Sequence, residues 1–118
     1  MVMIEQIASA ALQGEGLLLR SLTQDFLRDH ADLSACPRPN TDNAQVLATA
    51  AALIEMFAAR RNQDAPAWTG DIGALSEPVY LVKSALTMKH LRELCETQAP
   101  PSLRQRRLFA PPNFLEFV

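Results

Sequence analysis

Hydrophobic residues near the start of the chain recur every three or four positions, which is the spacing of one face of an α-helix. The first such stripe consists of Ile4, Ile7, Ala8, Ala11 and Leu12. Gly14 and Gly16 follow it, and glycine readily adopts the left-handed backbone conformation found at helix ends. We therefore expect a first helix that these two glycines close.

A second amphipathic stretch covers residues 17–31. Its polar side chains fall opposite an apolar face, as in a helix that covers a core. The expected inner face consists of Leu18, Leu19, Leu22, Phe26 and Leu27. Residues 34–40 are expected to form a loop, because Pro37 and Pro39 lack an amide donor and disfavour helix in the residue before them.

The most regular stripe of the chain lies in residues 43–62. Thr41 or Asp42 is expected to cap this third helix, because its side-chain oxygen can accept a hydrogen bond from an amide of the first turn. Leu53 and Phe57 lie at the centre of the stripe and are predicted to be core residues. The stripe as a whole contains Val46, Ala50, Leu53 and Phe57.

A fourth helix is predicted over residues 78–97, after an irregular stretch that contains the only tryptophan, Trp68. Ser76 is expected to cap this helix, and a proline in its first turn is tolerated there. Two prolines then end it, with room for one more short turn over residues 102–107. Its predicted inner side consists of Leu81, Ala85, Met88, Leu91 and Cys95.

These stripes predict an all-α fold, a small bundle of about four helices with an ordered C-terminal extension. Apolar and polar residues do not alternate with a period of two for more than a few positions, so no sheet beyond a stray bridge is expected. A chain of 118 residues suits a single domain that can bury a core of its own. We divide residues 1–118 into a helical body, 1–107, and an aromatic tail, 108–118.

The tail is unusually hydrophobic for a chain terminus. It holds three of the five phenylalanines, Phe109, Phe114 and Phe117. Three large apolar side chains in water favour aggregation, so either the tail packs on its own body or another chain covers it. Because two prolines separate the halves of the tail, we expect Phe109 to belong to the fold and residues 114–118 to serve mostly as a contact surface.

Composition narrows the function without identifying it. The net charge of −2 argues against a general nucleic-acid binder, and 48% hydrophobic with 20% charged residues is ordinary for a globular protein. The first residues do not resemble a signal peptide, and the apolar runs are far too short to span a membrane. A reducing cytoplasm is the expected compartment.

Residues that could support catalysis or metal binding are scattered along the sequence. His30, His90, Cys36 and Cys95 do not have the spacing of a metal site, and both thiols are expected to be buried. No glycine-rich phosphate loop or nucleophile elbow is present in the sequence. We therefore predict a non-enzymatic protein with no metal and no cofactor.

Positive charge is concentrated between residues 83 and 107. This stretch contains six cations and only two acidic residues, Glu93 and Glu96, which gives a local net charge of +4. This cluster could be a solubilising surface, a contact for an acidic protein or a contact for phosphates. Trp68 has two similar interpretations, a lid over the core or an anchor for a partner. The cations are Lys83, Lys89, Arg92, Arg104, Arg106 and Arg107.

The second half of the chain has a distinctive linear pattern. It reads Pro-Ala-Trp-Thr at residues 66–69, Leu-Ser-Glu-Pro-Val-Tyr-Leu-Val at 75–82, Leu-Arg-Glu-Leu-Cys at 91–95, Ala-Pro-Pro at 99–101 and Ala-Pro-Pro-Asn-Phe-Leu at 110–115. Over residues 66–118 this pattern resembles small uncharacterised bacterial proteins, antitoxin-like partners encoded beside nucleotidyltransferase-like toxins. The resemblance implies contact roles for the Trp68 loop and the aromatic tail, and it implies no catalytic residues.

Together these features predict a protein-interaction module, with an antitoxin-like neutraliser of a cognate protein as the specific form. A homo-oligomer is compatible with the same features, whereas specific nucleic-acid binding and membrane association are not expected. A small DNA-binding regulator that uses the fourth helix is the main alternative, and an enzyme is a third. The predicted partner-binding residues are Trp68, Arg104, Arg106, Arg107, Phe114, Leu115 and Phe117.

Overall fold

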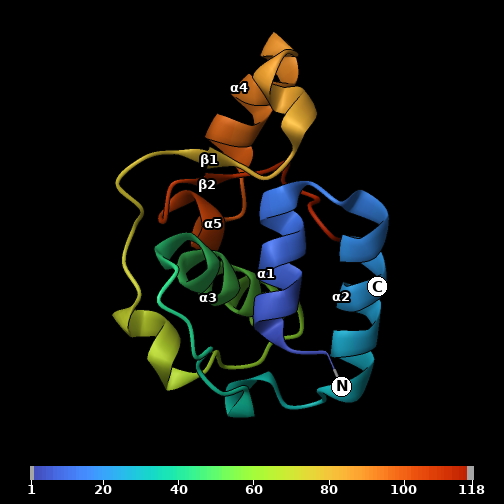
Figure 1. Ribbon diagram of the computed structural model, residues 1–118, viewed down its shortest axis with the longest axis vertical. Coiled ribbons are helices and arrows are strands. Elements are labelled where there is room, and N and C mark those ends of the chain that lie inside the picture. The colour runs from blue at the N-terminus through green and yellow to red at the C-terminus, as the bar shows by residue number, and fades with distance from the viewer. Residues whose placement is uncertain (1, 117–118) are drawn as a thin grey trace.

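A computed structural model describes residues 2–116, and its helices surround one central helix (Figure 1). Helices account for 58% of the structure and strands for 3%, which confirms the all-α prediction. The central helix is α3, Ala44–Arg60, most of whose side chains are buried. Alanines at positions such as 50, 51 and 52 of α3 are fully buried, and their small size lets neighbouring elements pack close to its axis.

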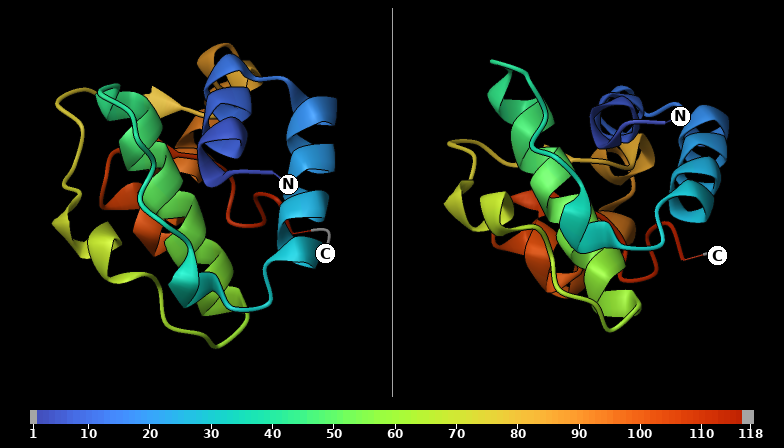
Figure 2. Two further views of the ribbon diagram at one scale, coloured as in Figure 1. Left: turned by 60° about the horizontal axis from the view of Figure 1, so that its bottom comes forward. Right: turned by 90° about the horizontal axis from the view of Figure 1, so that it is seen from below.

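Helices α1, Ile4–Gln13, and α2, Gly16–Asp29, form a hairpin beside α3 (Figures 1 and 2). Gly14 ends α1 in the left-handed conformation, with a φ of 71°, and its amide donates to the carbonyls at the end of the helix. The predicted role of Gly14 is thus confirmed, but Gly16 opens α2 instead of closing α1. The predicted inner face of α2 is also partly wrong, because the Leu18 side chain is 46% exposed.

The start of α3 differs from the prediction by a single residue. Asn43, and not Thr41 or Asp42, is the N-cap, and its Oδ1 accepts hydrogen bonds from the amides of Gln45 and Val46 at 3.0 and 3.1 Å. Thr41 instead accepts from the Asn43 amide. The helix interior is as predicted, since Leu53 is 0% and Phe57 2% exposed.

The region predicted as a fourth helix contains three short elements. Strand β1, Val79–Tyr80, is followed by the 3-10 helix η3, Lys83–Leu86, and by α4, Lys89–Gln98. The amides of Val79 and Leu81 donate hydrogen bonds to the carbonyls of Arg107 and Phe109, respectively. The prediction of one helix over 78–97 is therefore wrong at its N-terminal half, because β-forming residues there find backbone partners far along the chain.

Those partners belong to the C-terminal region. Helix α5, Pro101–Arg104, leads into strand β2, Leu108–Phe109, which pairs in parallel with β1. This two-residue ladder slightly exceeds the stray bridge that was expected. Two further 3-10 helices, η1 (Leu33–Ala35) and η2 (Ala67–Asp71), lie in the loops before and after α3 and pack on it.

Candidate functional site

The tail, in the part that the structure describes, runs from β2 along α3 towards α2 (Figures 1 and 2). Phe114 is only 8% exposed and belongs to the core. The Arg60 guanidinium holds the backbone here, donating to the carbonyl of Phe114 at 2.7 Å and to that of Pro112 at 3.5 Å. The expectation that Phe114 is a contact residue is therefore wrong, because its ring completes the protein's own core.

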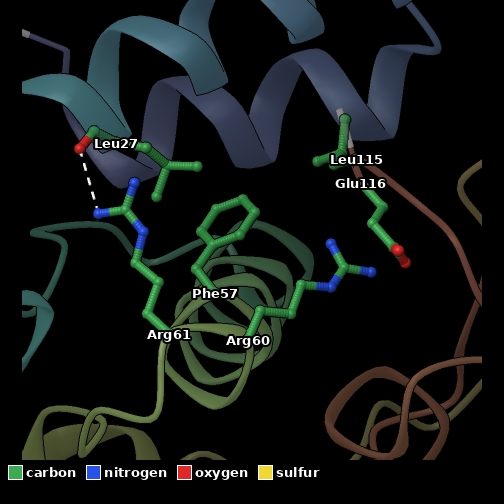
Figure 3. Close-up of a pocket in the computed structure, with 6 residues that line it drawn as sticks. All are labelled: Leu27, Phe57, Arg60, Arg61, Leu115 and Glu116. Atoms are coloured by element: carbon green, nitrogen blue, oxygen red, sulfur yellow. Dashed lines mark hydrogen bonds between the residues drawn. The ribbon is translucent and has the colours of Figure 1, made fainter. Parts of the chain in front are cut away.

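Leu115 continues this inward packing and lies half-buried against the core. Figure 3 shows it above Phe57, with Arg60 and Arg61 on either side of that ring. The six residues drawn enclose a cavity of about 70 Å³, too small for a peptide or a metabolite. Phe117, the last of the predicted tail contacts, lies outside the described residues. Phe109 is in β2 as part of the fold, half-buried, with its ring centre 5.4 Å from that of Tyr80.

Trp68 is held by the body of the protein. It lies in η2, and its indole nitrogen donates to the backbone carbonyl of Cys36 at 2.8 Å. Its ring is half-buried and packs against the core. This geometry favours the interpretation of Trp68 as a lid over the core rather than an anchor for a partner, since the polar end of its side chain already has an internal partner.

Arg106 is not part of the surface cluster, because it is only 3% exposed. Its guanidinium makes a two-point contact with the Glu55 carboxylate, at 2.6 and 3.0 Å. The same group also donates to the backbone carbonyls of Thr69, Ile72 and Ser102. Arg106 thus ties the C-terminal region and the Trp68 loop to α3. Its predicted contact with a partner has to be corrected to an internal structural role.

The environment of Glu55 matches this role. Burial by itself raises the pKa of the carboxyl, but the hydrogen bonds and the charge of Arg106 lower the pKa overall. Arg104 and Arg107 remain exposed, and each donates to a nearby carbonyl, Thr97 and Ser76 respectively, at 2.8 Å. The six cations of the sequence cluster are therefore divided between the interior and different parts of the surface.

The most prominent surface feature is the segment 83–98, which comprises η3 and α4 and which we term the arm. The arm extends from one end of the molecule in Figure 1. Helix α4 packs mainly on η3, and η3 in turn on β1. Ala85 and Cys95 are fully buried, yet neither belongs to the main core, so the arm has a small apolar centre of its own.

Two large apolar side chains of the arm are exposed. Leu86 is 58% and Met88 56% exposed, although Met88 was predicted to face the core. Leu91 and Leu94 on α4 are half-buried beside them. A helix that covers only a short 3-10 turn leaves part of its apolar stripe without a partner, and such a surface is typical of binding sites.

The turn between α1 and α2 meets the base of the arm. A Cβ placed on Gly14 would lie 2.6 Å from Cε of Lys83, so the aliphatic stem of this lysine packs directly on the glycine. Leu17, 90% exposed, and Leu18 begin α2 just after this contact. We give the name apical surface to the four exposed apolar residues of the arm and of the first turn of α2, together with the lysine that packs on Gly14: Leu17, Leu18, Lys83, Leu86 and Met88.

The arm side of the apical surface is cationic, whereas the exposed Glu15 lies beside Gly14 in the α1–α2 turn. Between Lys83 and Arg92 the chain carries three cations and no carboxylate. Lys83 and Lys89 are exposed, and neither has a carboxylate within 4.0 Å among residues 2–116. Glu96, farther along α4, accepts a hydrogen bond from the Tyr80 hydroxyl, which raises the pKa of that phenol and fastens the arm to the ladder.

Other parts of the described chain offer less chemistry. An open groove of about 510 Å³ lies between α3 and the corner around Pro100. Its two charged residues are already engaged, Glu55 by Arg106 and Arg60 by the tail. Burial raises the pKa of the Cys36 thiol to about 11 and also raises that of Cys95, so neither favours the reactive thiolate. Residues 2–116 contain no group of three side chains placed to hold a metal ion.

Comparison with known proteins gives no assignment: no protein-family model matches the chain, and no curated protein or solved structure shows significant similarity to it. Within the described residues, every helix is too short or too polar to cross a membrane. The apical surface combines exposed apolar side chains with a lysine that has no carboxylate partner among residues 2–116, and it is thus the strongest candidate functional site. Sequence reasoning missed it because Leu18 and Met88 fit the predicted core stripes, and because spacing does not show that Lys83 packs beside the start of α2.

Proposed function

We propose that this protein is a non-enzymatic interaction module that binds another protein through the apical surface. The observation that supports this most strongly is the exposure of Leu86 and Met88 on an arm that stands apart from the main core. Large apolar side chains in such positions gain most by being covered by a partner. The α1–α2 turn packs on the base of the arm through the contact between Gly14 and Lys83.

The specific form of the proposal is an antitoxin-like neutraliser in the cytoplasm. In that role the arm would lie over the functional site of the cognate protein and block it by occlusion, with no chemistry of its own. The resemblance of residues 66–118 to such proteins supports this form, and the arm lies within that range.

The test is affinity purification of the tagged protein from its native host. A variant with Leu86→Ser and Met88→Ser should lose the co-purifying protein, while both variant and wild type remain folded by circular dichroism. Met3→Ser is a matched control, because Met3 is also an exposed apolar residue, 45% exposed, at the opposite end of α1. Retention of the same partner by the double variant would refute the proposal.

One observation favours the alternative of a DNA-binding regulator. Helix α4 protrudes, it is free of the described part of the tail, and its Lys89 and His90 are exposed. A recognition helix needs this accessibility, but Glu93 and Glu96 on the same helix oppose phosphate binding. We expect only weak, sequence-independent binding of duplex DNA in a mobility-shift assay. Sub-micromolar, sequence-selective binding near physiological salt would favour the regulator instead.

A further inference from the structure

We propose that the partner presents to the apical surface an apolar ridge flanked by carboxylates, as in an amphipathic helix with Asp or Glu beside its apolar stripe. This inference rests on the proposed function and specifies the chemistry of the partner. It follows from the charges around the exposed apolar residues and from the position of one lysine.

Lys83 connects the two elements that carry the exposed apolar residues, because it lies three residues before Leu86 and packs on Gly14, which lies three residues before Leu17. Its stem packs on Gly14, which has no side chain to displace it, so the base of the side chain is fixed. Its ammonium has no carboxylate partner among the described residues and is exposed. A partner that contacted both Leu17 and Leu86 would lie near this lysine, where a carboxylate would be favoured.

Lys89 places a second positive charge farther along the arm, where a partner carboxylate would again be favoured. It follows Met88 directly, it is exposed, and no acidic residue lies beside it in the sequence. The nearest acidic residues of the arm lie beyond Arg92, and one of them, Glu96, is held by Tyr80. A partner with carboxylates along its apolar ridge therefore complements the arm, and a basic partner would be repelled.

The same charges argue against a second copy of this chain as the occupant. In a two-fold symmetric contact the patch of one copy packs on the same patch of the other, which brings the Lys83 and Lys89 side chains of both copies into one interface. Like charges in such a contact are unfavourable unless acids separate them. An anionic lipid surface would meet the charge requirement, but the apolar residues belong to two separate elements and do not form the long continuous stripe of a membrane-surface helix.

The experiment selects peptides from a display library of random amphipathic helices on the immobilised wild-type protein. We expect enriched sequences to carry apolar residues three and four positions apart with Asp or Glu beside them. The best synthetic peptide should bind Lys83→Glu about tenfold more weakly than wild type. Its affinity should also fall as salt rises. Lys83→Met, which keeps an unbranched stem but removes the charge, should show a smaller loss.

Arg38→Glu is the control, because it makes the same charge change at an exposed loop residue outside the apical surface. It should leave peptide affinity unchanged, and thermal melts should verify that all variants are folded. Enriched peptides without acidic residues would overturn the inference, as would self-association or binding to phosphatidylglycerol vesicles that depends on Leu86. These outcomes would refute only the chemistry inferred for the partner. The proposed function itself would fail by a different result, retention of the host partner by the variant with Leu86→Ser and Met88→Ser.

Discussion

Replacement of Arg106 tests how the C-terminal half is attached to α3. Its guanidinium donates to the Glu55 carboxylate and to three backbone carbonyls, and the residue is only 3% exposed. Arg106→Met keeps much of the stem but removes the guanidinium donors; the Thr69 carbonyl keeps the Ile72 amide, and the Glu55 carboxylate keeps the Gln105 side chain at 3.4 Å. Loss of one partner from a buried ion pair typically costs about 3–5 kcal/mol, because the other charge remains uncompensated.

The geometry is consistent with this range for the loss in the free energy of unfolding. If every acceptor were left completely unsatisfied, the total cost would exceed about 3–5 kcal/mol, since each buried unsatisfied group costs about 1–3 kcal/mol. The Glu55 side chain, however, is 20% exposed, so water can reach its carboxylate once the guanidinium is gone. We therefore expect a decrease of about 3–5 kcal/mol in the free energy of unfolding, measured by urea denaturation followed by circular dichroism.

Arg104→Met is the matched control, because Arg104 is exposed and donates to a single carbonyl. It should change the free energy of unfolding by less than about 0.5 kcal/mol. A second variant, Glu55→Met with Arg106→Met, removes both charges and should recover part of the loss. A decrease below about 1 kcal/mol in the Arg106→Met variant would refute the structural role that we assign to this network.

Three further predictions concern stability. Because the pKa of Glu55 is lowered in the folded state, its contribution is complete above the ordinary glutamate pKa of 4.5 and is lost as pH falls through the lowered value; urea midpoints measured against pH should show this loss in wild type and much less of it in Glu55→Gln. Phe114→Ala should cost about 3 kcal/mol in equilibrium unfolding, since its ring is core, whereas a cost near zero would return the tail to a contact role. Gly14→Ala should destabilise by about 1–2 kcal/mol because its φ is 71° and a Cβ would press on Lys83; Gly16→Ala, with open space around it, should be neutral or stabilising, and equal thermal melts for the two alanine variants would contradict this difference.

The parts of the fold that the sequence predicted well are those that local pattern determines. The stripe centred on Leu53 and Phe57 and the cap at Gly14 depend on side chains within a few turns of one another, so periodicity and glycine conformation suffice to identify them. The helix predicted from residue 78 fails because Val79 and Tyr80 pair with backbone groups about thirty residues away. Periodicity carries no information about such distant hydrogen-bond partners.

The candidate site was harder to predict for a related reason. A sequence shows that Arg104, Arg106 and Arg107 are clustered, but not that one of them reaches a carboxylate 51 residues away and becomes buried. Similarly, an apolar stripe predicts that Met88 will be covered, whereas only the structure shows that the covering element is a short 3-10 turn. Which residues remain at the surface is decided by tertiary packing, which local spacing does not specify.

The most direct test of the account is amide hydrogen exchange of the protein with and without its co-purified partner. We predict that binding slows exchange in the arm, residues 83–98, and in the turn around Gly14 and Leu17, while exchange in residues 110–116 of the tail stays unchanged. Protection of the tail or of the Trp68 loop, with the arm exchanging as in the free protein, would contradict the apical surface as the binding site.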